Sequence, residues 1–281
     1  MPTLKDISRR LRSVVSIQKI TKSMKMVSAS KYARAERELN VSKAFGSGAM
    51  EFYEKTGLSK PNESINTTGK SLAIILSSDK GLCGSIHAGL ARHIRALIRE
   101  SVGEQISYVL LGDKIRNMLQ RQLSKKFIFT GSGIGRKSVS FTESSAIALA
   151  INDIAHQFDS VSILYNHFKS IVAYKITNVP VFTADEMEKS QKLTNYDSAD
   201  SEVIRCFQEF NLAAIIYYTF KENFTCELAS RMNAMEGATK NAGELIDKLR
   251  LHYNRTRQFV ITRELIEIIS GASVLSEKEA R

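Results

Sequence analysis

Prolines are almost absent from this chain, and their placement limits what its two ends can form. The 281 residues contain only Pro2, Pro61 and Pro180, so residues 3–57 and 206–281 are free of the residue that breaks helices from within. At about 1.5 Å per residue, helices of these lengths would reach roughly 80 and 110 Å. A compact domain of this size is only about 30–40 Å across. The sequence therefore predicts two long helical arms that extend from a compact middle.

The N-terminal arm, residues 1–57, carries an apolar stripe at helical spacing. Its members recur at steps of three or four, or multiples of those: Leu4, Ile7, Leu11, Val14, Ile20, Met24 and Val27. Small residues follow at Ser28, Ala29 and Ala33, where another helix could approach closely. Breaker residues at 57–62 end the arm.

The C-terminal arm, residues 206–281, has a seam of the coiled-coil type. Steps of mostly three or four connect Leu228, Met232, Met235, Ala238, Ala242, Leu245, Leu249, Tyr253, Thr256 and Val260. A long helix with a solvated apolar stripe is not stable alone. Because both arms leave one compact middle, we expect them to pack against each other as an antiparallel coiled coil.

The middle, residues 58–205, changes to a strand-and-helix pattern. Apolar runs predict strands at 71–78, 107–111, 126–130, 161–168 and 171–177, with helices near 90–97, 115–123 and 142–157. The polar residues 185–203 predict a surface loop. This alternation predicts the α/β class, with a three-layer, Rossmann-like domain between the helical arms.

The charge and the cysteines indicate which partners and which cellular compartment suit the chain. The net charge is +11, and residues 1–57 carry 12 Lys/Arg against 5 Asp/Glu. A solvated helix face explains such a surplus, and so does an acidic partner such as nucleic acid, a membrane surface or a protein. No apolar run of about 18 residues predicts a membrane span. Three cysteines without a CxxC pair favour free thiols in a reducing compartment.

Two loops resemble nucleotide sites only superficially. The loop at 79–85 follows a predicted strand and precedes a predicted helix, but its glycines fit neither GxGxxG nor GxxxxGK[ST]. The glycine-rich stretch 131–137 has Arg136 where a dinucleotide fingerprint needs glycine, and residues 138–141 do not resemble a helix start. We expect loops that face a partner or solvent. With no paired histidines and no GxSxG elbow, we expect no metal, no cofactor and no catalysis on this chain.

Long stretches in all three regions resemble one known family. They are IQKITKSMKMV at 17–27, SSDKGLCG at 77–84 and ITRELIEIISGA at 261–272. Together the resemblance covers essentially the whole chain, and it is to the γ subunits, the central rotor stalks of F-type ATP synthases. The residues at 22–26 and 32–37 are more similar to mitochondrial than to bacterial members.

The resemblance implies both partners and a mechanism. Three α and three β subunits would surround the coiled coil, and the rest would stand on the c ring beside the small δ and ε stalk subunits. Proton flow would turn the ring and this chain, and each β site would be driven through open and closed states. ATP, ADP and magnesium would bind the α and β subunits. Association with the membrane would come only through the complex, with no nucleic acid involved.

The resemblance also assigns contacts to particular residues. Arg257 and Gln258 match the positions that catch a β-subunit loop. Lys80, Gly81, Leu82, Cys83 and Gly84 match a lower-stalk contact loop. Ile268, Ile269, Val274 and Leu275 would form an apolar tip in a bearing at the top of the α/β head.

The cellular location of the chain and two alternative functions are also expected from the sequence. The resemblance implies the matrix side of the mitochondrial inner membrane, in a mature form because no transit peptide is visible, with the cytoplasmic face of a bacterial inner membrane as the alternative. A basic coiled-coil protein that binds nucleic acid through the N-terminal arm would show strongly salt-dependent affinity. A nucleotide-binding enzyme that uses the middle domain is the other rival, and the loop spacings argue against it.

Overall fold

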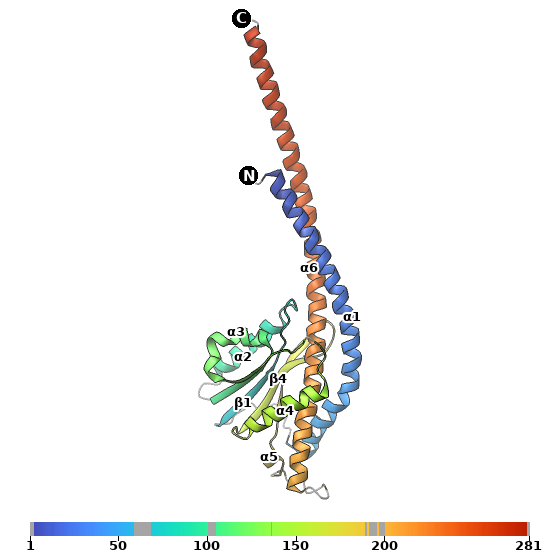
Figure 1. The fold of residues 1–281 in the computed structure, drawn as a ribbon, viewed down its shortest axis with the longest axis vertical. Coiled ribbons are helices and arrows are strands. Elements are labelled where there is room, and N and C mark those ends of the chain that lie inside the picture. Colours follow the sequence, from blue (N-terminus) through green and yellow to red (C-terminus); the bar gives the residue numbers. More distant parts are fainter. Residues whose placement is uncertain are drawn as a thin grey trace. The chain divides into compact units, whose positions relative to one another are not determined.

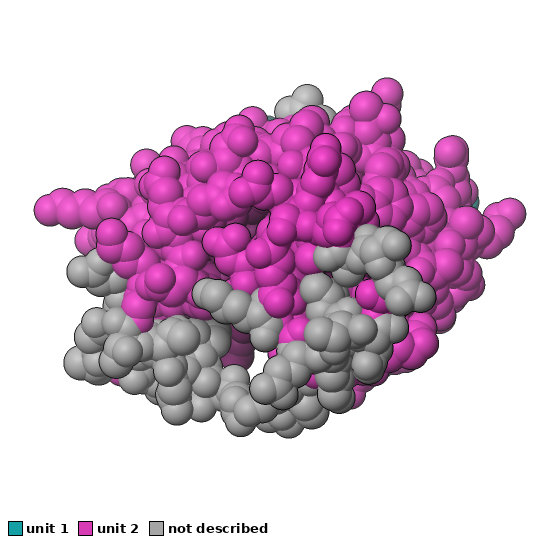
Figure 2. All heavy atoms as spheres, turned by 90° about the horizontal axis from the view of Figure 1, so that it is seen from below, with its two compact units in different colours: residues 1–26, 234–281 teal, residues 27–233 magenta. Residues whose placement is uncertain are grey.

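The computed structural model describes residues 3–58, 69–100, 105–135, 137–188, 190, 196 and 200–279, apart from the side chains at 100, 105 and 274–279. The chain, drawn as a ribbon in Figure 1, divides into two compact units, and the view in Figure 2 shows mainly the second of them. Unit 1 contains residues 1–26 and 234–281, and unit 2 contains residues 27–233. The two long helices, α1 (Leu4–Thr56) and α6 (Ser201–Glu279), contribute to both units. The division into three parts at 57/58 and 205/206, expected from the sequence, stays a prediction.

In unit 1, α1 and α6 pack side by side and antiparallel. Val14 is buried together with Ala242, Ile246 and Leu249 in a small apolar cluster. Further along, the Thr239 hydroxyl donates to the Thr21 hydroxyl at 2.9 Å, and Lys25 Nζ lies 2.7 Å from Glu236 Oε1. These pairs run in opposite directions along the two helices, as the expected antiparallel coiled coil requires.

The seam on α1 is a strict heptad that passes through polar residues. Every seventh residue is buried: Ile7, Val14, Thr21, Ser28, Ala35, Ser42, Ala49 and Thr56. The predicted stripe was wrong at Ile20 and Val27, which are 57% and 55% exposed. It was right at Ile7 and Val14 but missed Thr21 and Ser28, because small hydroxyl side chains, which allow close helix contact, do not register as apolar. A 3.5-residue period of this kind is typical of a left-handed supercoil.

The seam on α6 also differs from the prediction at one position. Leu245 is 37% exposed, and its neighbour Ile246 is buried instead. The other predicted members are buried or half-buried. From Ala242 through Ile246 and Leu249 to Tyr253 the steps are four, three and four, as an alternating seam requires, whereas Leu245 would give two successive steps of four.

Unit 2 contains a five-stranded sheet in the order β3-β2-β1-β4-β5. Its strands are β1 (Lys70–Leu76), β2 (Gln105–Leu111), β3 (Phe127–Gly131), β4 (Ser160–Phe168) and β5 (Tyr174–Val181). All neighbours are parallel except β4 and β5, which form an antiparallel hairpin. This sheet confirms the predicted Rossmann-like α/β class.

Helices cover both faces of the sheet (Figure 1). On one face, Ile75 packs with α2 (Ile86–Glu100) and α3 (Asp113–Leu123). On the other, Ile74 and Leu76 pack with α4 (Phe141–Ala155), α1 and α6. Alternate β1 side chains therefore enter two separate cores, which explains the continuous apolar run of this strand.

Several element boundaries differ from the sequence prediction. β5 lies three to four residues later than expected, because residues 169–173 close the hairpin, with Ala173 N donating to Ser170 O at 3.2 Å. α4 begins at Phe141 despite the expectation for 138–141, since Ser140 and Glu143 cap it reciprocally. α6 begins at Ser201, and the short α5 (Ala184–Glu188) occupies part of the predicted loop. No helix in the described ranges is long and apolar enough to cross a membrane.

Candidate functional site

A polar face of α6 is buried inside unit 2. Between positions 221 and 231 the helix carries Lys221, Glu222, Asn223, Glu227 and Arg231, each no more than 9% exposed. Buried polar groups of this kind are stable only when they are paired. Four of them bond another part of unit 2, and Glu227 pairs with Arg231 on the same helix. Together we call these five residues the polar face.

Lys221 connects three segments of unit 2. Its Nζ donates to Glu38 Oε2 on α1 at 2.9 Å and to Ser138 Oγ, in the segment before α4, at 2.7 Å. Ser138 in turn donates to Glu38 at 2.6 Å. Burial raises the pKa of Glu38, but the bonds from Ser138, Lys221 and Arg34 outweigh it and lower that pKa to about 2. Glu38 therefore stays ionised at neutral pH and keeps Lys221 paired.

Glu222 and Asn223 fasten α6 to the sheet. Glu222 accepts from Tyr218 at 2.8 Å, and its other oxygen lies 2.9 Å from His167 Nδ1 on β4. Asn223 accepts from Asn166 on β4 at 2.8 Å and donates to Ser77 O, just past β1, at 3.4 Å. Burial, and then the neighbouring Glu222, raises the pKa of Tyr218 above its ordinary value. The carboxyl ends of the two central strands are thus bonded to the helix.

Arg231 holds the predicted contact loop, residues 80–84. Its Nε and Nη2 donate to Gly81 O at 3.3 and 3.1 Å, and Nη2 also pairs with Glu227. The neighbouring Ser230 hydroxyl donates to Cys83 O at 2.5 Å. The sequence did not reveal the Glu227–Arg231 pair, because opposite charges four residues apart on a helix usually lie on its surface. The one available signal was their position beside the seam residue Leu228.

The side chains of the contact loop point in different directions. Cys83 is 2% exposed, and burial raises the pKa of its thiol to about 11. Leu82 is 61% exposed and has a φ of 64°, a left-handed conformation that is uncommon for a branched residue. Of the predicted loop residues, Leu82 is therefore the large side chain presented outward, and Cys83 is a core residue.

Several groups of the same loop are already bonded within the chain. A phosphate loop presents backbone N–H groups at a helix N-terminus. Here the side chain of Asp79 already accepts from Asp113 N at 2.9 Å, at the start of α3, and from Gly133 N at 2.7 Å. The carbonyls of Gly81 and Cys83 are bonded to α6. Both glycine-containing loops are thus joined through Asp79, and Arg136 lies outside the described residues.

The other predicted contacts lie on the far end of α6, in unit 1. Arg257 and Gln258 are both exposed. Every residue from 261 to 273 is also exposed, including Ile268 at 67% and Ile269 at 65%. Arg263 and Glu267 form a surface pair at 2.9 Å. The side chains of Val274 and Leu275 lie outside the described residues. This end of α6 therefore offers a broad apolar stripe, because at 3.6 residues per turn its five large apolar side chains lie within about half of the circumference, opposite the Arg263–Glu267 pair.

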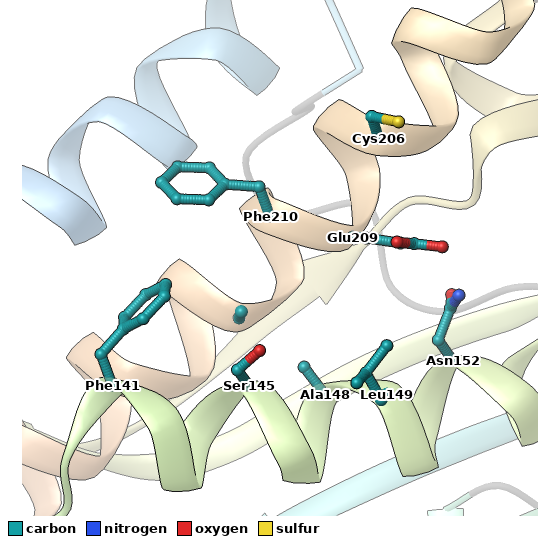
Figure 3. Close-up of a pocket in the computed structure, with 9 residues that line it drawn as sticks. Phe141, Ser145, Ala148, Leu149, Asn152, Cys206, Glu209 and Phe210 are labelled. Atoms are coloured by element: carbon teal, nitrogen blue, oxygen red, sulfur yellow. The ribbon is translucent and has the colours of Figure 1, made fainter.

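A shallow pocket that the sequence did not predict lies between α4 and α6 in unit 2 (Figure 3). Its volume is about 240 Å³, and Phe141, Leu149 and Phe210 line it beside the polar Asn152 and Glu209. Its residues form no nucleophile–base arrangement. Among the residues that the structure describes, no three His, Cys, Asp or Glu side chains come together as metal ligands would.

A long antiparallel helix pair together with a Rossmann-like sheet defines a stalk type of protein, and sequence comparison gives its family. The chain matches the ATP synthase family over residues 3–275. It is 49% identical to the mitochondrial ATP synthase subunit γ of Drosophila melanogaster, over 98% of this chain and 92% of that protein. It is 46% identical to the mitochondrial F(1) complex subunit γ of Rattus norvegicus, over 97% of this chain and 99% of that protein.

A solved structure agrees with these relatives. A chain of the central stalk and c ring of Tetrahymena thermophila mitochondrial ATP synthase superposes with a TM-score of 0.64 at 27% identity, over 78% of this chain and 99% of that chain. The chain therefore belongs to the ATP synthase family, among its mitochondrial γ subunits. It is the central-stalk subunit of the rotor, as the resemblance implied.

Proposed function

We propose that this chain transmits torque without catalysing a reaction itself, through an exposed end of α6 that turns inside a ring of partner subunits. The observation that carries this proposal is the exposure of all residues from 261 to 273, which include five large apolar side chains. Large exposed apolar surfaces mark interaction sites. A helix with so broad an apolar stripe is expected to be covered by other protein surfaces. Ile268, Ile269, Val274 and Leu275 then form the bearing.

Arg257 and Gln258 are proposed to catch a loop of a β subunit. Both are exposed one to two turns before the apolar end. The guanidinium of arginine can donate two parallel bonds to a carboxylate, and the glutamine amide can donate or accept beside it. A catch of this kind suits a contact that forms and breaks once in each rotary step.

Leu82, together with Lys80, Gly81, Cys83 and Gly84, is proposed as the lower-stalk contact. The exposed Leu82 supplies the apolar anchor, and the buried Cys83 fixes the loop from within. The partner is a β subunit or one of the small δ and ε subunits, with the c ring below them. The buried thiol makes labelling of Cys83 a poor probe of this contact, so substitution of Leu82 is the better test.

Nucleotide and magnesium are proposed to bind the α and β subunits of the complex. The Asp79 carboxylate already accepts from backbone N–H groups at the start of α3 and at Gly133, so these donors are taken within the chain. One asymmetric chain in a threefold ring presents a different face to each β subunit, which biases three otherwise equal sites. The complex would stand on the matrix side of the mitochondrial inner membrane.

Reconstitution tests this proposal. The chain is mixed with purified α and β subunits, and assembly, magnesium-dependent ATP hydrolysis and rotation of a probe on this chain are measured. We expect one copy per complex, and Arg257→Ala with Gln258→Ala should lower the hydrolysis rate at least threefold without preventing assembly. Arg250→Ala is the control, because Arg250 is exposed and pairs only loosely with Asp247 at 3.7 Å. No complex, with salt-sensitive binding to nucleic acid instead, would contradict the proposal.

A further inference from the structure

Arg231 is a buried charge whose contacts reach beyond its own helix. We propose that Glu227 and Arg231 are positioning residues that clamp the loop at 79–85 to α6, so that a force on Leu82 passes directly into the long helix. This inference rests on the proposed rotor function and adds a route for torque between the contact loop and α6. All of these residues belong to unit 2.

The clamp bonds the loop at several points. Arg231 directs two nitrogens at Gly81 O, at 3.3 and 3.1 Å, and Ser230 holds Cys83 O at 2.5 Å. His87 Nε2 lies 3.1 Å from Lys80 O and 3.3 Å from Ser78 Oγ. Carbonyls on both sides of Leu82 therefore face inward and are bonded. A loop fixed in this way moves with the helix rather than bending under load.

Burial strengthens the pair that orients the arginine. Glu227 is 1% exposed and Arg231 is 9% exposed, so their attraction is weakly screened by solvent. The planar guanidinium can donate to the carboxylate and to a carbonyl at the same time, and it does so in a more rigid geometry than a lysine ammonium. Glu227 thus sets the direction in which Arg231 reaches the loop.

Gly135 provides the room that this arrangement needs. A Cβ added there would lie 2.7 Å from the Ser78 Cβ and 3.1 Å from Glu227 Oε2. Any side chain at this position would displace the carboxylate that orients Arg231. In the described part of unit 2, Glu227 Oε2 has no hydrogen-bond partner, so the carboxylate is held mainly through its other oxygen.

The strain at Leu82 fits the same role. Its φ of 64° is unfavourable for a leucine, and its side chain is 61% exposed. A strained residue persists only where its surroundings determine its conformation. Here the flanking bonds to Gly81 O and Cys83 O supply that constraint and keep the leucine side chain outward, ready to meet a partner subunit.

The test compares coupling with loop mobility in the whole enzyme, reconstituted in lipid vesicles. The main variant combines Glu227→Gln with Arg231→Met, which removes both charges and so leaves no unpaired buried ion. The second variant, Arg231→Lys, keeps the charge but loses the two-nitrogen contact. Arg116→Gln is the matched control, because Arg116 forms an exposed pair with Asp113 at 3.8 Å. Amide hydrogen exchange at 80–84 and protons pumped per ATP hydrolysed are measured for each.

We expect the double variant to exchange at least tenfold faster at 80–84 and to pump at least threefold fewer protons per ATP, with hydrolysis within twofold of the unaltered enzyme. Arg231→Lys should lie between the two, and Arg116→Gln should change neither quantity. Unchanged exchange would show that the pair does not fix the loop, and faster exchange with full coupling would show that the clamp carries no torque. If the double variant does not assemble, Arg231→Lys decides by the same criteria. Failure of the unaltered chain to pump would instead reject the proposed function.

Discussion

Two stretches of the same helix, α6, reverse the usual relation between polarity and burial. Residues 221–231 place charged and amide side chains in the interior of unit 2, where all but Glu227, which pairs with Arg231 on α6 itself, have a partner on another segment. Residues 261–273 leave isoleucine and leucine side chains exposed in unit 1. The first stretch is complete within the chain, whereas the second lacks a covering surface. Burial of polar groups therefore marks where α6 is fastened, and exposure of apolar groups marks where it meets other subunits.

The largest effect on stability should come from breaking the polar face. Arg231→Ala leaves the carboxylate of Glu227, which is 1% exposed, buried without its counter-ion. We expect it to lower the free energy of unfolding by about 3–5 kcal/mol. Urea unfolding of the full chain measures this change. Arg116→Ala, on an exposed pair, should cost about 0.5 kcal/mol or less, and an equal loss in both variants would remove the distinction.

The close contact of α1 with α6 should give the next largest effect. A Cβ at Gly46 would lie 2.2 Å from Tyr218 Cδ1, so Gly46→Ala forces the ring or the helix to move. We expect a loss of about 1–3 kcal/mol from this overpacking. At Gly48 on the same helix, an added Cβ would meet no described atom within 4 Å. Gly48→Ala should therefore stabilise by about 0.5–1 kcal/mol through helix propensity, and thermal melting distinguishes the two signs.

The pairing of Glu38 with Lys221 should appear as a pH dependence. The pKa of Glu38 is lowered to about 2 in the folded chain, from an ordinary value near 4.5. A depressed carboxyl pKa gives stability that is present above the unfolded pKa and is lost as pH falls toward 2. Allowing for the partial exposure of Glu38, this contribution is about 1–2 kcal/mol. Unfolding curves of the native chain and Glu38→Gln between pH 6 and pH 2.5 should converge at low pH, and parallel curves would contradict the pairing.

The smallest effect on the chain itself should come from its exposed end. Ile268→Ser with Ile269→Ser should change the free energy of unfolding by less than about 0.5 kcal/mol, since both side chains are already solvated. The affinity of this double variant for the α and β subunits should nevertheless fall by about tenfold or more, because each substitution removes about 1–2 kcal/mol of the free energy gained when an isoleucine is buried on binding. Titration of assembly measures this loss. A large fall in the stability of the isolated chain would mean that this end is packed after all.

The helix periodicity shows how far the sequence could be interpreted. It predicted both long helices, since no proline interrupts them, and it predicted an antiparallel pair. It placed Ile20, Val27 and Leu245 in the seam, where the structure places Thr21, Ser28 and Ile246. A search for apolar residues follows hydrophobicity, but close helix contact selects small side chains of any polarity. The heptad becomes visible only when the partner helix is in place.

The candidate contact residues also divide into those whose placement the sequence predicted and those whose placement only the structure revealed. Because two adjacent residues cannot both face the seam, the sequence predicted that at least one of Arg257 and Gln258 points outward, and the structure leaves both exposed. The roles of Cys83 and Arg231 could not be predicted from the sequence. Cys83 is buried and Arg231 is internal only because residues 150 positions apart in the chain, Gly81 and Arg231, meet in the folded unit.

By itself, the sequence determined the class of fold, the two long helices, five strands in nearly correct places, and membership of a family of rotor stalks. These properties are local or periodic, so neighbouring residues carry their signal. The tertiary structure alone decided which charges are buried, which loop is bonded to α6 and which apolar residues remain exposed. Those properties depend on contacts between distant segments, and the free energy of a charge or an isoleucine is set by what surrounds it rather than by its neighbours in the chain.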